Sequence, residues 1–298
     1  MSAEIISGKE IAATIRGETA DRVAALQEKH DFTPGLATVL VGEDPASQSY
    51  VGMKNKTAKE MGIYSRQITL DAETPEAELL GIVEGLNADP EIHGILVQLP
   101  LPDQIDESKI LMAIDPAKDV DGFHPINVGR LATGEKDVLV PCTPAGIVQM
   151  LLRSGNDPSG KHCVIVGRSN IVGRPMASLL LRKAPGGNAT VTVCHSRTAD
   201  LGAMTRLADI LIVAIGWPNT VTADMVKPGA AVIDVGTNRV DDDTRERGWR
   251  LVGDVAFDEV KEVASAITPV PGGVGPMTIT MLMSNTVDAA VRQAGIEE

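Results

Sequence analysis

The sequence predicts an α/β protein of two domains, the second of which carries a doubly wound parallel sheet. Short apolar runs alternate with helical patterns along the chain, and one of these runs leads into a helix through a glycine-containing turn. The length of 298 residues is enough for two hydrophobic cores. The chain is 43% hydrophobic, yet no run of about 18 apolar residues predicts a membrane-spanning helix.

In the first half of the chain, strand and helix patterns follow one another between turn residues. Ser7 and Glu10 have the spacing of a capping box, which predicts a helix start. The further expected elements are a strand over 36–41, a helix over 48–61 closed by Gly62, a helix with Thr74 as N-cap and Pro75 as its first residue, and a strand over 94–99 stopped by Pro100.

In the second half, short apolar strands alternate with helical stretches, which is typical of a parallel sheet. Residues 115–143 are rich in Gly, Pro and Asp and are expected to be irregular, and a helix follows from Thr143 to about Arg153. The expected strands are 162–167, 190–195, 210–216 and 230–236, and the expected closing helix is 278–294. We therefore predict an N-terminal domain over 1–143, completed by 278–298, and a second domain over 144–277.

Composition excludes several classes of function. A net charge of −13 and only 2% aromatic residues argue against nucleic-acid binding. The N-terminus lacks the apolar segment of a secretory signal. The widely spaced Cys142, Cys163 and Cys194 are interpreted as buried free thiols, and the scattered histidines show no metal-ligand spacing. We expect a cytoplasmic protein that binds no metal, membrane or nucleic acid.

The turn between the strand at 162–167 and the next helix is the candidate cofactor loop. In Gly167-Arg-Ser-Asn-Ile-Val-Gly173, small residues and a helix N-terminus suit a dinucleotide pyrophosphate. Ser169 stands where the usual pattern has its second glycine, so the motif alone is weak. A tight turn without a ligand stays open as the alternative.

The end of the next strand favours NADP over NAD. An NAD enzyme usually has an acidic residue here for the ribose 2′-hydroxyl, whereas this chain has Ser196 and Arg197. Arg197 and Arg168 could pair with a 2′-phosphate through charge-assisted hydrogen bonds. The alternative for Arg197 is an ordinary solvated loop charge.

A set of polar residues in the first half is a candidate catalytic site. Tyr50 and Lys54 are four residues apart on one face of a predicted helix, and Gln98 lies at a strand end. Asp121 follows in a glycine-containing loop. A solvated lysine, a tyrosine that covers the core and a plain turn at Asp121 are the ordinary alternatives. Residues 269–278 hold three prolines and three glycines, which would suit either a stiff loop beside a planar ligand or a structural linker.

Six motifs in order resemble one known family. They are Tyr50-x-x-x-Lys54, Val97-Gln-Leu-Pro-Leu-Pro102, Lys118-Asp-Val-Asp-Gly-Phe-His-Pro125, Pro141-Cys-Thr-Pro144, Gly167-Arg-Ser-Asn-Ile-Val-Gly-Arg-Pro175 and Pro269 to Thr278. Over nearly its whole length the chain resembles bifunctional methylenetetrahydrofolate dehydrogenase/methenyltetrahydrofolate cyclohydrolase. The resemblance implies an N-terminal folate/catalytic domain, a Rossmann-like NADP-binding domain and a homodimer formed through the latter.

The resemblance also implies a role for each candidate residue. Lys54 would be the central catalytic residue and would serve mainly in the hydrolytic step, with Tyr50 against the folate, Gln98 bonded to Lys54 and Asp121 on the pterin ring. The implied cofactor contacts are Gly167, Arg168, Ser169, Ser196, Arg197 and Thr237, and the implied further folate contacts are Pro271, Gly272 and Gly273. Many relatives carry a branched apolar residue at the position of Thr237. The folate substrate would be free or polyglutamylated.

Three other functions are weighed against this interpretation. A dehydrogenase without cyclohydrolase activity is disfavoured by Lys54. A non-catalytic NADP-binding sensor is disfavoured by the complete set of Tyr50, Lys54, Gln98 and Asp121. A related two-domain dehydrogenase acting on shikimate-like acids is disfavoured by the segment 119–125.

Overall fold

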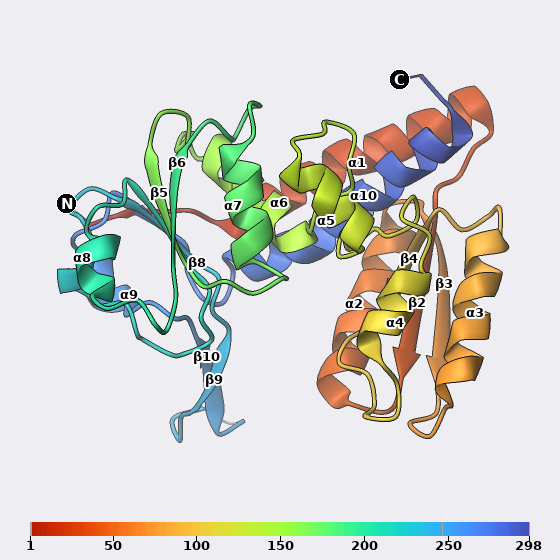
Figure 1. Ribbon diagram of the computed structural model, residues 1–298, viewed down its shortest axis with the longest axis horizontal. Coiled ribbons are helices and arrows are strands. Elements are labelled where there is room, and N and C mark those ends of the chain that lie inside the picture. Colours follow the sequence, from red (N-terminus) through yellow and green to blue (C-terminus); the bar gives the residue numbers. More distant parts are fainter. Residues whose placement is uncertain (1, 246, 298) are drawn as a thin grey trace. The chain divides into compact units, whose positions relative to one another are not determined.

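The computed structural model describes residues 2–245 and 247–297. The chain divides into two compact units. The six-stranded unit consists of Met1–Ala12 and Thr143–Thr278, and the three-stranded unit consists of Ala13–Cys142 and Ile279–Glu298. Both units are α/β, as the sequence predicts (Figure 1).

A parallel sheet with the order β3-β2-β4 is the centre of the three-stranded unit. Its strands are β2 (Gly35–Val41), β3 (Tyr64–Leu70) and β4 (Gly94–Val97). Its helices are α2 (Pro45–Glu60), α3 (Glu76–Ala88), α4 (Glu107–Ala113) and α5 (Pro125–Ala132), together with most of α1 (Gly8–His30) and α10 (Val274–Ala294).

Helices cover both faces of this sheet, because successive side chains of the buried strand β2 point to opposite sides. Leu36 packs in a core with residues of α1, α2 and α10. Ala37 and Val39 pack in a second core with residues of α3 and α4. In Figure 1, α2 and α3 accordingly lie on opposite sides of the strands. The sheet is therefore held between two apolar layers.

The six-stranded unit has a parallel sheet with the order β1-β11-β8-β7-β5-β6. Its strands are β1 (Glu4–Ile5), β5 (His162–Val166), β6 (Thr190–Cys194), β7 (Ile210–Val213), β8 (Ala231–Asp234) and β11 (Ala266–Ile267). From β5 the chain moves outward to β6 and then returns to the other side of β5 as β7. The strand order therefore reverses between β5 and β7, where doubly wound sheets bind ligands at the carboxyl ends of their strands.

The remaining elements of this unit surround the sheet. They are the helices α6 (Cys142–Arg153), α7 (Gly173–Leu181), α8 (Leu201–Thr205) and α9 (Phe257–Val260), the 3-10 helix η1 (Ala223–Met225), and an antiparallel pair of β9 (Asn238–Asp241) with β10 (Trp249–Val252). The pair carries a cation–π stack in which Arg239 and Arg247 lie over the ring of Trp249.

Several expected elements were wrong in detail. Thr74 does not cap α3: the helix begins at Glu76, and the cap position is held by Pro75. Residues 115–143 are not irregular throughout, because Pro125 opens α5 and the ring nitrogen of His124 accepts the bond from Ile126 N. The expected 162–167, 190–195, 210–216, 230–236 and 94–99 strands end one to three residues earlier, and α10 begins at Val274 rather than Thr278.

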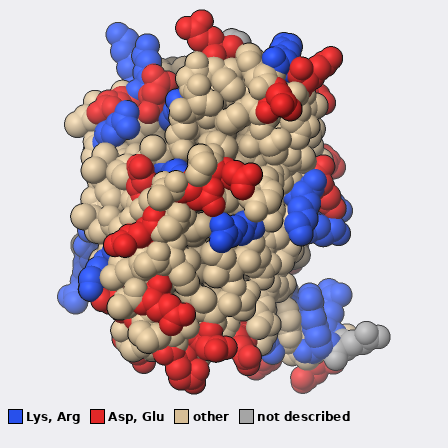
Figure 2. Space-filling view, turned by 90° about the vertical axis from the view of Figure 1, so that its right-hand side faces the viewer, with Lys and Arg blue, Asp and Glu red and all other residues tan. Residues whose placement is uncertain are grey.

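The structure also shows the state of the three cysteines and the distribution of charge on one face of the surface. All three cysteines are buried free thiols, as predicted. On the face drawn in Figure 2, Lys and Arg side chains are interspersed with Asp and Glu and form no broad basic patch. Within the described ranges, no helix is long and apolar enough to cross a membrane.

Candidate active site

Lys54 and Gln98 meet at one end of the three-stranded sheet. Lys54 lies on α2 and is 9% exposed, and Gln98 directly follows β4. The Lys54 Nζ donates to Gln98 Oε1 at 3.0 Å. Gln98 Nε2 donates to the Leu99 carbonyl at 2.6 Å, which fixes the amide with its oxygen toward the lysine. The structure therefore brings together two residues that the sequence places 44 positions apart.

Asp121 belongs to the same site. Burial raises the pKa of its carboxyl group, and the nearby charge of Lys54 opposes that rise. The thiol of Cys142 lies 3.8 Å from Asp121 Oδ1 and 3.4 Å from the Val120 carbonyl. The pKa of the Cys142 thiol is raised well above its usual value, mainly by burial and to a smaller extent by the nearby Asp121. This sulfur therefore stays protonated and can donate a hydrogen bond. The site thus brings together an aspartate carboxyl group, a lysine amino group and a neutral thiol.

Contacts from within the loop and from helix α10 fix the loop that carries Asp121. The Asp119 carboxylate accepts from Gly122 N at 3.1 Å and from His124 N at 2.8 Å. The Asn285 amide on α10 donates to the carbonyls of Val120 and Val140 at 2.8 and 2.9 Å. Asp121 is therefore held by its neighbours in sequence and by a helix more than 160 residues away.

Gly122 allows the loop to pack closely. Its φ of +75° favours glycine, and a Cβ at this position would collide with the backbone of Val140 and Pro141. The turn predicted at Asp121-Gly122 is present, and it also aims a carboxylate at the site.

A polar network beneath α2 fixes Lys54 from the other side. Its neighbour Asn55, 6% exposed, accepts from Thr38 Oγ1 at 3.0 Å and from Ser65 Oγ at 2.7 Å. Asn55 Nδ2 donates to Gln67 Oε1 at 2.7 Å. These bonds join α2 to both β2 and β3, so the helix cannot turn about its axis without breaking them.

Tyr50 lies one helical turn before Lys54 on α2, and its side chain is 47% exposed. An exposed aromatic ring beside a cation suits contact with a planar ligand. The position agrees with the shared helix face that the four-residue spacing predicts, and the assigned role toward folate stays a prediction.

The glycine loop of the six-stranded unit forms a close turn between β5 and α7. Gly167 has a φ of +133°, and a Cβ there would overlap the Ala214 carbonyl oxygen. A Cβ on Gly173 would overlap the backbone of Gly167 and Arg168. Ser169 Oγ accepts from Val172 N at 3.1 Å at the start of α7. The two glycines thus allow a tight turn at the point where the strand order reverses, which is where such sheets bind dinucleotides.

The turn after β6 lies beside this loop, because β5 and β6 are neighbours and Gly167 N donates to the Cys194 carbonyl at 2.8 Å. The His195 ring nitrogen accepts from Arg197 N at 3.1 Å, and His195 N donates to Thr198 Oγ1 at 3.0 Å. Ser196, Arg197, Arg168 and Ser169 are all exposed. The structure therefore groups the predicted phosphate-binding residues at one edge of the sheet.

Thr237 and the proline-rich loop lie elsewhere in the six-stranded unit. Thr237 follows β8, which is separated from β5 by β7. Gly272 accepts a backbone bond from Lys9 N at 3.0 Å, and a Cβ on Gly8 would collide with Gly273. The exposed Pro271 precedes this pair. This close backbone packing accounts for the glycines structurally, and the roles of Pro271, Gly272, Gly273 and Thr237 toward ligands stay predictions.

Sequence reasoning missed several supporting residues. The sequence predicts only a buried thiol at Cys142, and no motif includes Asn285. The loop after β7 and the buried Asp234 and Asp254 were missed as well. One signal was available for Asp234, which closes an apolar strand, because strand ends are where these folds place functional groups.

Two family models together match most of the chain. The catalytic domain of tetrahydrofolate dehydrogenase/cyclohydrolase matches residues 6–121, and the NAD(P)-binding domain of the same family matches residues 141–294. The bifunctional protein FolD of Syntrophobacter fumaroxidans is 59% identical over 289 residues, which is 97% of either chain.

Solved structures agree. The bifunctional FolD methylenetetrahydrofolate dehydrogenase/cyclohydrolase of Campylobacter jejuni is 49% identical, with a TM-score of 0.92 over 98% of this chain and 100% of that one. A methylenetetrahydrofolate dehydrogenase-cyclohydrolase of Trypanosoma brucei, complexed with NADP cofactor and inhibitor, is 41% identical, with a TM-score of 0.92 over 99% of this chain and 100% of that one.

Proposed function

This chain belongs to the tetrahydrofolate dehydrogenase/cyclohydrolase family, and we propose that it catalyses both reactions. It oxidises 5,10-methylenetetrahydrofolate to the methenyl form with NADP, and it hydrolyses the methenyl form to 10-formyltetrahydrofolate. The observation that carries the hydrolytic part is the buried Lys54, which donates to Gln98 Oε1 at 3.0 Å near the Asp121 carboxylate.

The residues around the glycine loop fit NADP. Gly167 and Gly173 allow a tight turn that a Cβ at either position would disrupt, and the N-terminus of α7, with the Gly173 N–H, would face a pyrophosphate. Arg168 and Arg197 would pair with the 2′-phosphate, and Ser169, Ser196 and Thr237 would supply further polar contacts. When bound, NADP supplies the nicotinamide carbon that accepts the hydride.

The protein has little proton chemistry to perform in the oxidation. The folate nitrogen beside the methylene carbon stabilises the cation that forms, so no side chain has to remove a proton. The chain must hold the reacting carbons within about 3 to 3.5 Å of each other. Tyr50, one turn from Lys54, would lie against the aromatic part of the folate.

The hydrolysis does need proton transfer. Water adds to the cationic methenyl carbon, and Lys54 in its neutral amine form takes the proton that the water loses. The bond from this carbon to N5 then breaks as N5 takes up a proton and the carbonyl of the formyl group forms, with one net proton released. Gln98 keeps Nζ aimed at the reacting carbon because its own amide is fixed by the Leu99 carbonyl.

Asp121 would orient the folate. A carboxylate accepts hydrogen bonds from the amino and ring N–H groups of a pterin, and the contacts from Asp119 and Asn285 hold its loop in place. Because burial raises the pKa of Asp121, the fraction of the ionised form falls at a higher pH than for a solvated aspartate. Folate affinity should therefore weaken as the pH falls through the acidic range.

One assay tests the proposal. Purified protein is mixed with methylenetetrahydrofolate and either NADP or NAD, and absorbance follows both the reduced cofactor and the methenyl product. We expect reduction with NADP, slower reduction with NAD and little accumulation of the methenyl product. Persistent methenyl product would overturn the cyclohydrolase part, and equal turnover with NAD would overturn the cofactor assignment.

Four further properties are part of the same proposal. The chain would form a homodimer through the NADP-binding domain, act in the cytoplasm, and accept polyglutamylated folates. Residues 1–143 with 278–298 would form the folate/catalytic domain and 144–277 the NADP-binding domain, except that the first twelve residues group with the six-stranded unit, to whose sheet they add β1; family matches over 6–121 and 141–294 support this division. Light scattering of the purified protein would test the dimer.

A further inference from the structure

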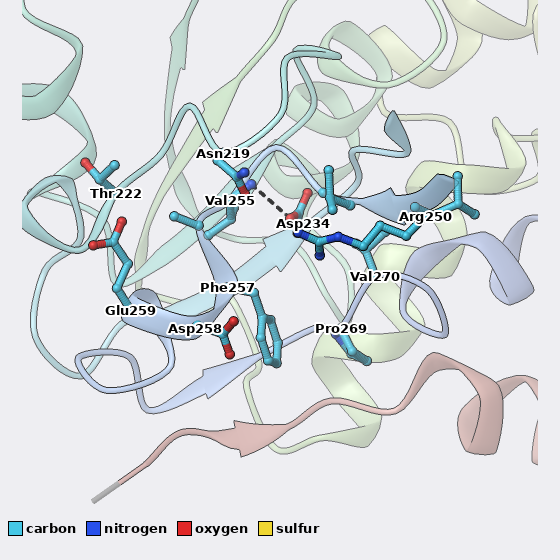
Figure 3. A pocket seen from close by; sticks show the side chains of 14 residues that line it. Asn219, Thr222, Asp234, Arg250, Val255, Phe257, Asp258, Glu259, Pro269 and Val270 are labelled. Atoms are coloured by element: carbon cyan, nitrogen blue, oxygen red, sulfur yellow. Dashed lines mark hydrogen bonds between the residues drawn. The ribbon is translucent and has the colours of Figure 1, made fainter. Parts of the chain in front are cut away.

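Two buried aspartates lie at the carboxyl edge of the six-stranded sheet. Asp234 ends β8 and is 2% exposed, and Asp254 follows β10 and is fully buried. Neither has a role in the chemistry described above. Asp234 lines a pocket at this edge together with Arg250 and Pro269 (Figure 3).

Asp254 ties together the loops that follow β7 and β8. Its Oδ2 accepts from Ile215 N at 2.7 Å and from Gly216 N at 2.9 Å. Its Oδ1 accepts from Asn238 Nδ2 at 2.8 Å. One carboxylate therefore satisfies three donors from two loops, and both of its oxygens are used.

Asp234 holds Asp254 in place. Its Oδ1 accepts from Gly236 N and from Asp254 N, both at 2.9 Å, and its Oδ2 accepts from Val255 N at 3.0 Å. Each of the two carboxylates also packs closely against a glycine. A Cβ on Gly236 would overlap the Asp254 carboxylate, and a Cβ on Gly253 would overlap that of Asp234. This arrangement leaves the backbone little room to shift.

The loops held by Asp254 border the point where the strand order reverses. The loop after β7 begins at Ala214, whose carbonyl oxygen lies where a Cβ of Gly167 would be. Gly216, with a φ of +73°, would be free to move if its N–H were released. Thr237 lies between Gly236 and Asn238, both of which are bonded to the aspartate pair.

We propose that Asp254, braced by Asp234, is a positioning residue for the cofactor: it holds the loops after β7 and β8 in the geometry that accepts NADP. This inference rests on the proposed function. Without the carboxylate, three partly buried donors lose their acceptor and the loops must be ordered when the dinucleotide binds. NADP should therefore bind more weakly. Cofactor-free hydrolysis of the methenyl substrate, which depends on Lys54 in the other unit, is spared.

The chain contains its own reporter for this test. Of the two tryptophans, Trp217 follows Gly216 directly and is 71% exposed, and Trp249 is stacked with Arg239 and Arg247. NADPH absorbs where tryptophan emits, so quenching of this emission on titration gives a dissociation constant without any turnover. The Asp254→Asn variant keeps the side-chain size and places an N–H group where an acceptor is needed.

The experiment titrates NADPH into the wild type, Asp254→Asn and Asp258→Asn, and measures cofactor-free methenyltetrahydrofolate hydrolysis in each. Asp258 is the matched control, because it removes the same charge from an exposed site close in sequence. We expect the dissociation constant of Asp254→Asn to rise about tenfold or more while hydrolysis stays at the wild-type rate. Asp258→Asn should change neither quantity.

An unchanged NADPH dissociation constant in Asp254→Asn would overturn the inference. If that variant does not fold, Asn238→Ala removes only the link to the loop after β8 and should raise the constant about threefold, and no rise there would also overturn it. A wild-type protein that hydrolyses the methenyl substrate but binds no NADPH would overturn the cofactor part of the proposed function, and this inference with it.

Discussion

The candidate site of the three-stranded unit is built from side chains, whereas that of the six-stranded unit is built from backbone. In the three-stranded unit, Lys54, Gln98 and Asp121 present side chains that neighbouring segments fix by hydrogen bonds. In the six-stranded unit, the absence of side chains at Gly167 and Gly173 lets the turn between β5 and α7 pack closely on neighbouring backbone, and this turn is the proposed cofactor loop. We therefore expect a substitution in the first site to change the rate of the reaction, whereas a substitution in the second should change the shape of the loop and its affinity for the cofactor.

The largest effect is expected from removing the lysine. Lys54→Met should lower cyclohydrolase activity about a thousandfold, because the proton acceptor for the attacking water is lost. The methenyl product should then accumulate during methylenetetrahydrofolate oxidation, as seen by absorbance. Lys56→Met is the matched control, since Lys56 is two residues further on α2 and pairs at the surface with Glu60 at 3.8 Å. Equal hydrolysis by both variants would remove Lys54 from the mechanism.

A methyl group in the glycine loop should act on the cofactor alone. Gly167→Ala adds a Cβ that overlaps the Ala214 carbonyl and forces a φ of +133° on alanine. We expect NADPH to bind about 10- to 100-fold more weakly, from the strain that such a residue carries. Gly85→Ala on α3, where the added methyl meets nothing within 4 Å, should bind as the wild type does. Fluorescence titration measures both, and equal affinity would show that the loop is not a cofactor cradle.

The turn after β6 is where we expect the protein to distinguish NADP from NAD. Arg197→Ala should weaken NADPH binding about tenfold through loss of a charge-assisted bond to the 2′-phosphate, and leave NADH binding unchanged. The exposed Lys183 provides a control of the same charge in the same unit. If Arg197→Ala and Lys183→Ala weaken NADPH equally, Arg197 contributes only general charge.

The smallest effect concerns stability and Asp234. Burial raises the pKa of this carboxyl group from 3.8 to about 6, so the folded state binds its proton more tightly than the unfolded state does. Its contribution to stability is full below the unfolded pKa and is lost as the pH rises through the folded pKa. From about pH 5 to about pH 7 the wild type should lose about 1 kcal/mol of unfolding free energy relative to Asp234→Asn.

Denaturant unfolding at the two pH values, followed by tryptophan emission, measures this difference. Both tryptophans belong to the six-stranded unit, so the signal reports on the unit that contains Asp234. A difference between the two proteins that does not change with pH would mean that Asp234 titrates as a solvated carboxyl group.

Much of the fold could be predicted because the buried strands are apolar runs. β2, β5 and β7 are almost wholly buried; β5 and β7 fall within predicted strands, and β2 begins one residue before its predicted strand over 36–41. The edge strand β3 was missed, because its half-exposed sequence from Tyr64 to Leu70 has no continuous apolar run. Helix α5 was missed because its proline and glycine suggested a loop, although proline suits a first helical turn.

The candidate site could be predicted only in part. Lys54, Gln98 and Asp121 were identified from motifs and strand ends. Their supports come from distant segments: Asn285 reaches Val120 across 165 residues, and Asp254 reaches Ile215 across 39. No local pattern in one sequence encodes such a pairing, because it depends on how the elements pack.

The most direct test of this division of labour is cofactor-free hydrolysis of methenyltetrahydrofolate by Lys54→Met and Gly167→Ala, measured side by side. Hydrolysis should be nearly abolished in Lys54→Met and stay at the wild-type rate in Gly167→Ala. Equal loss in both variants, with both folded, would contradict the claim that one unit supplies the reacting side chains and the other the cofactor cradle.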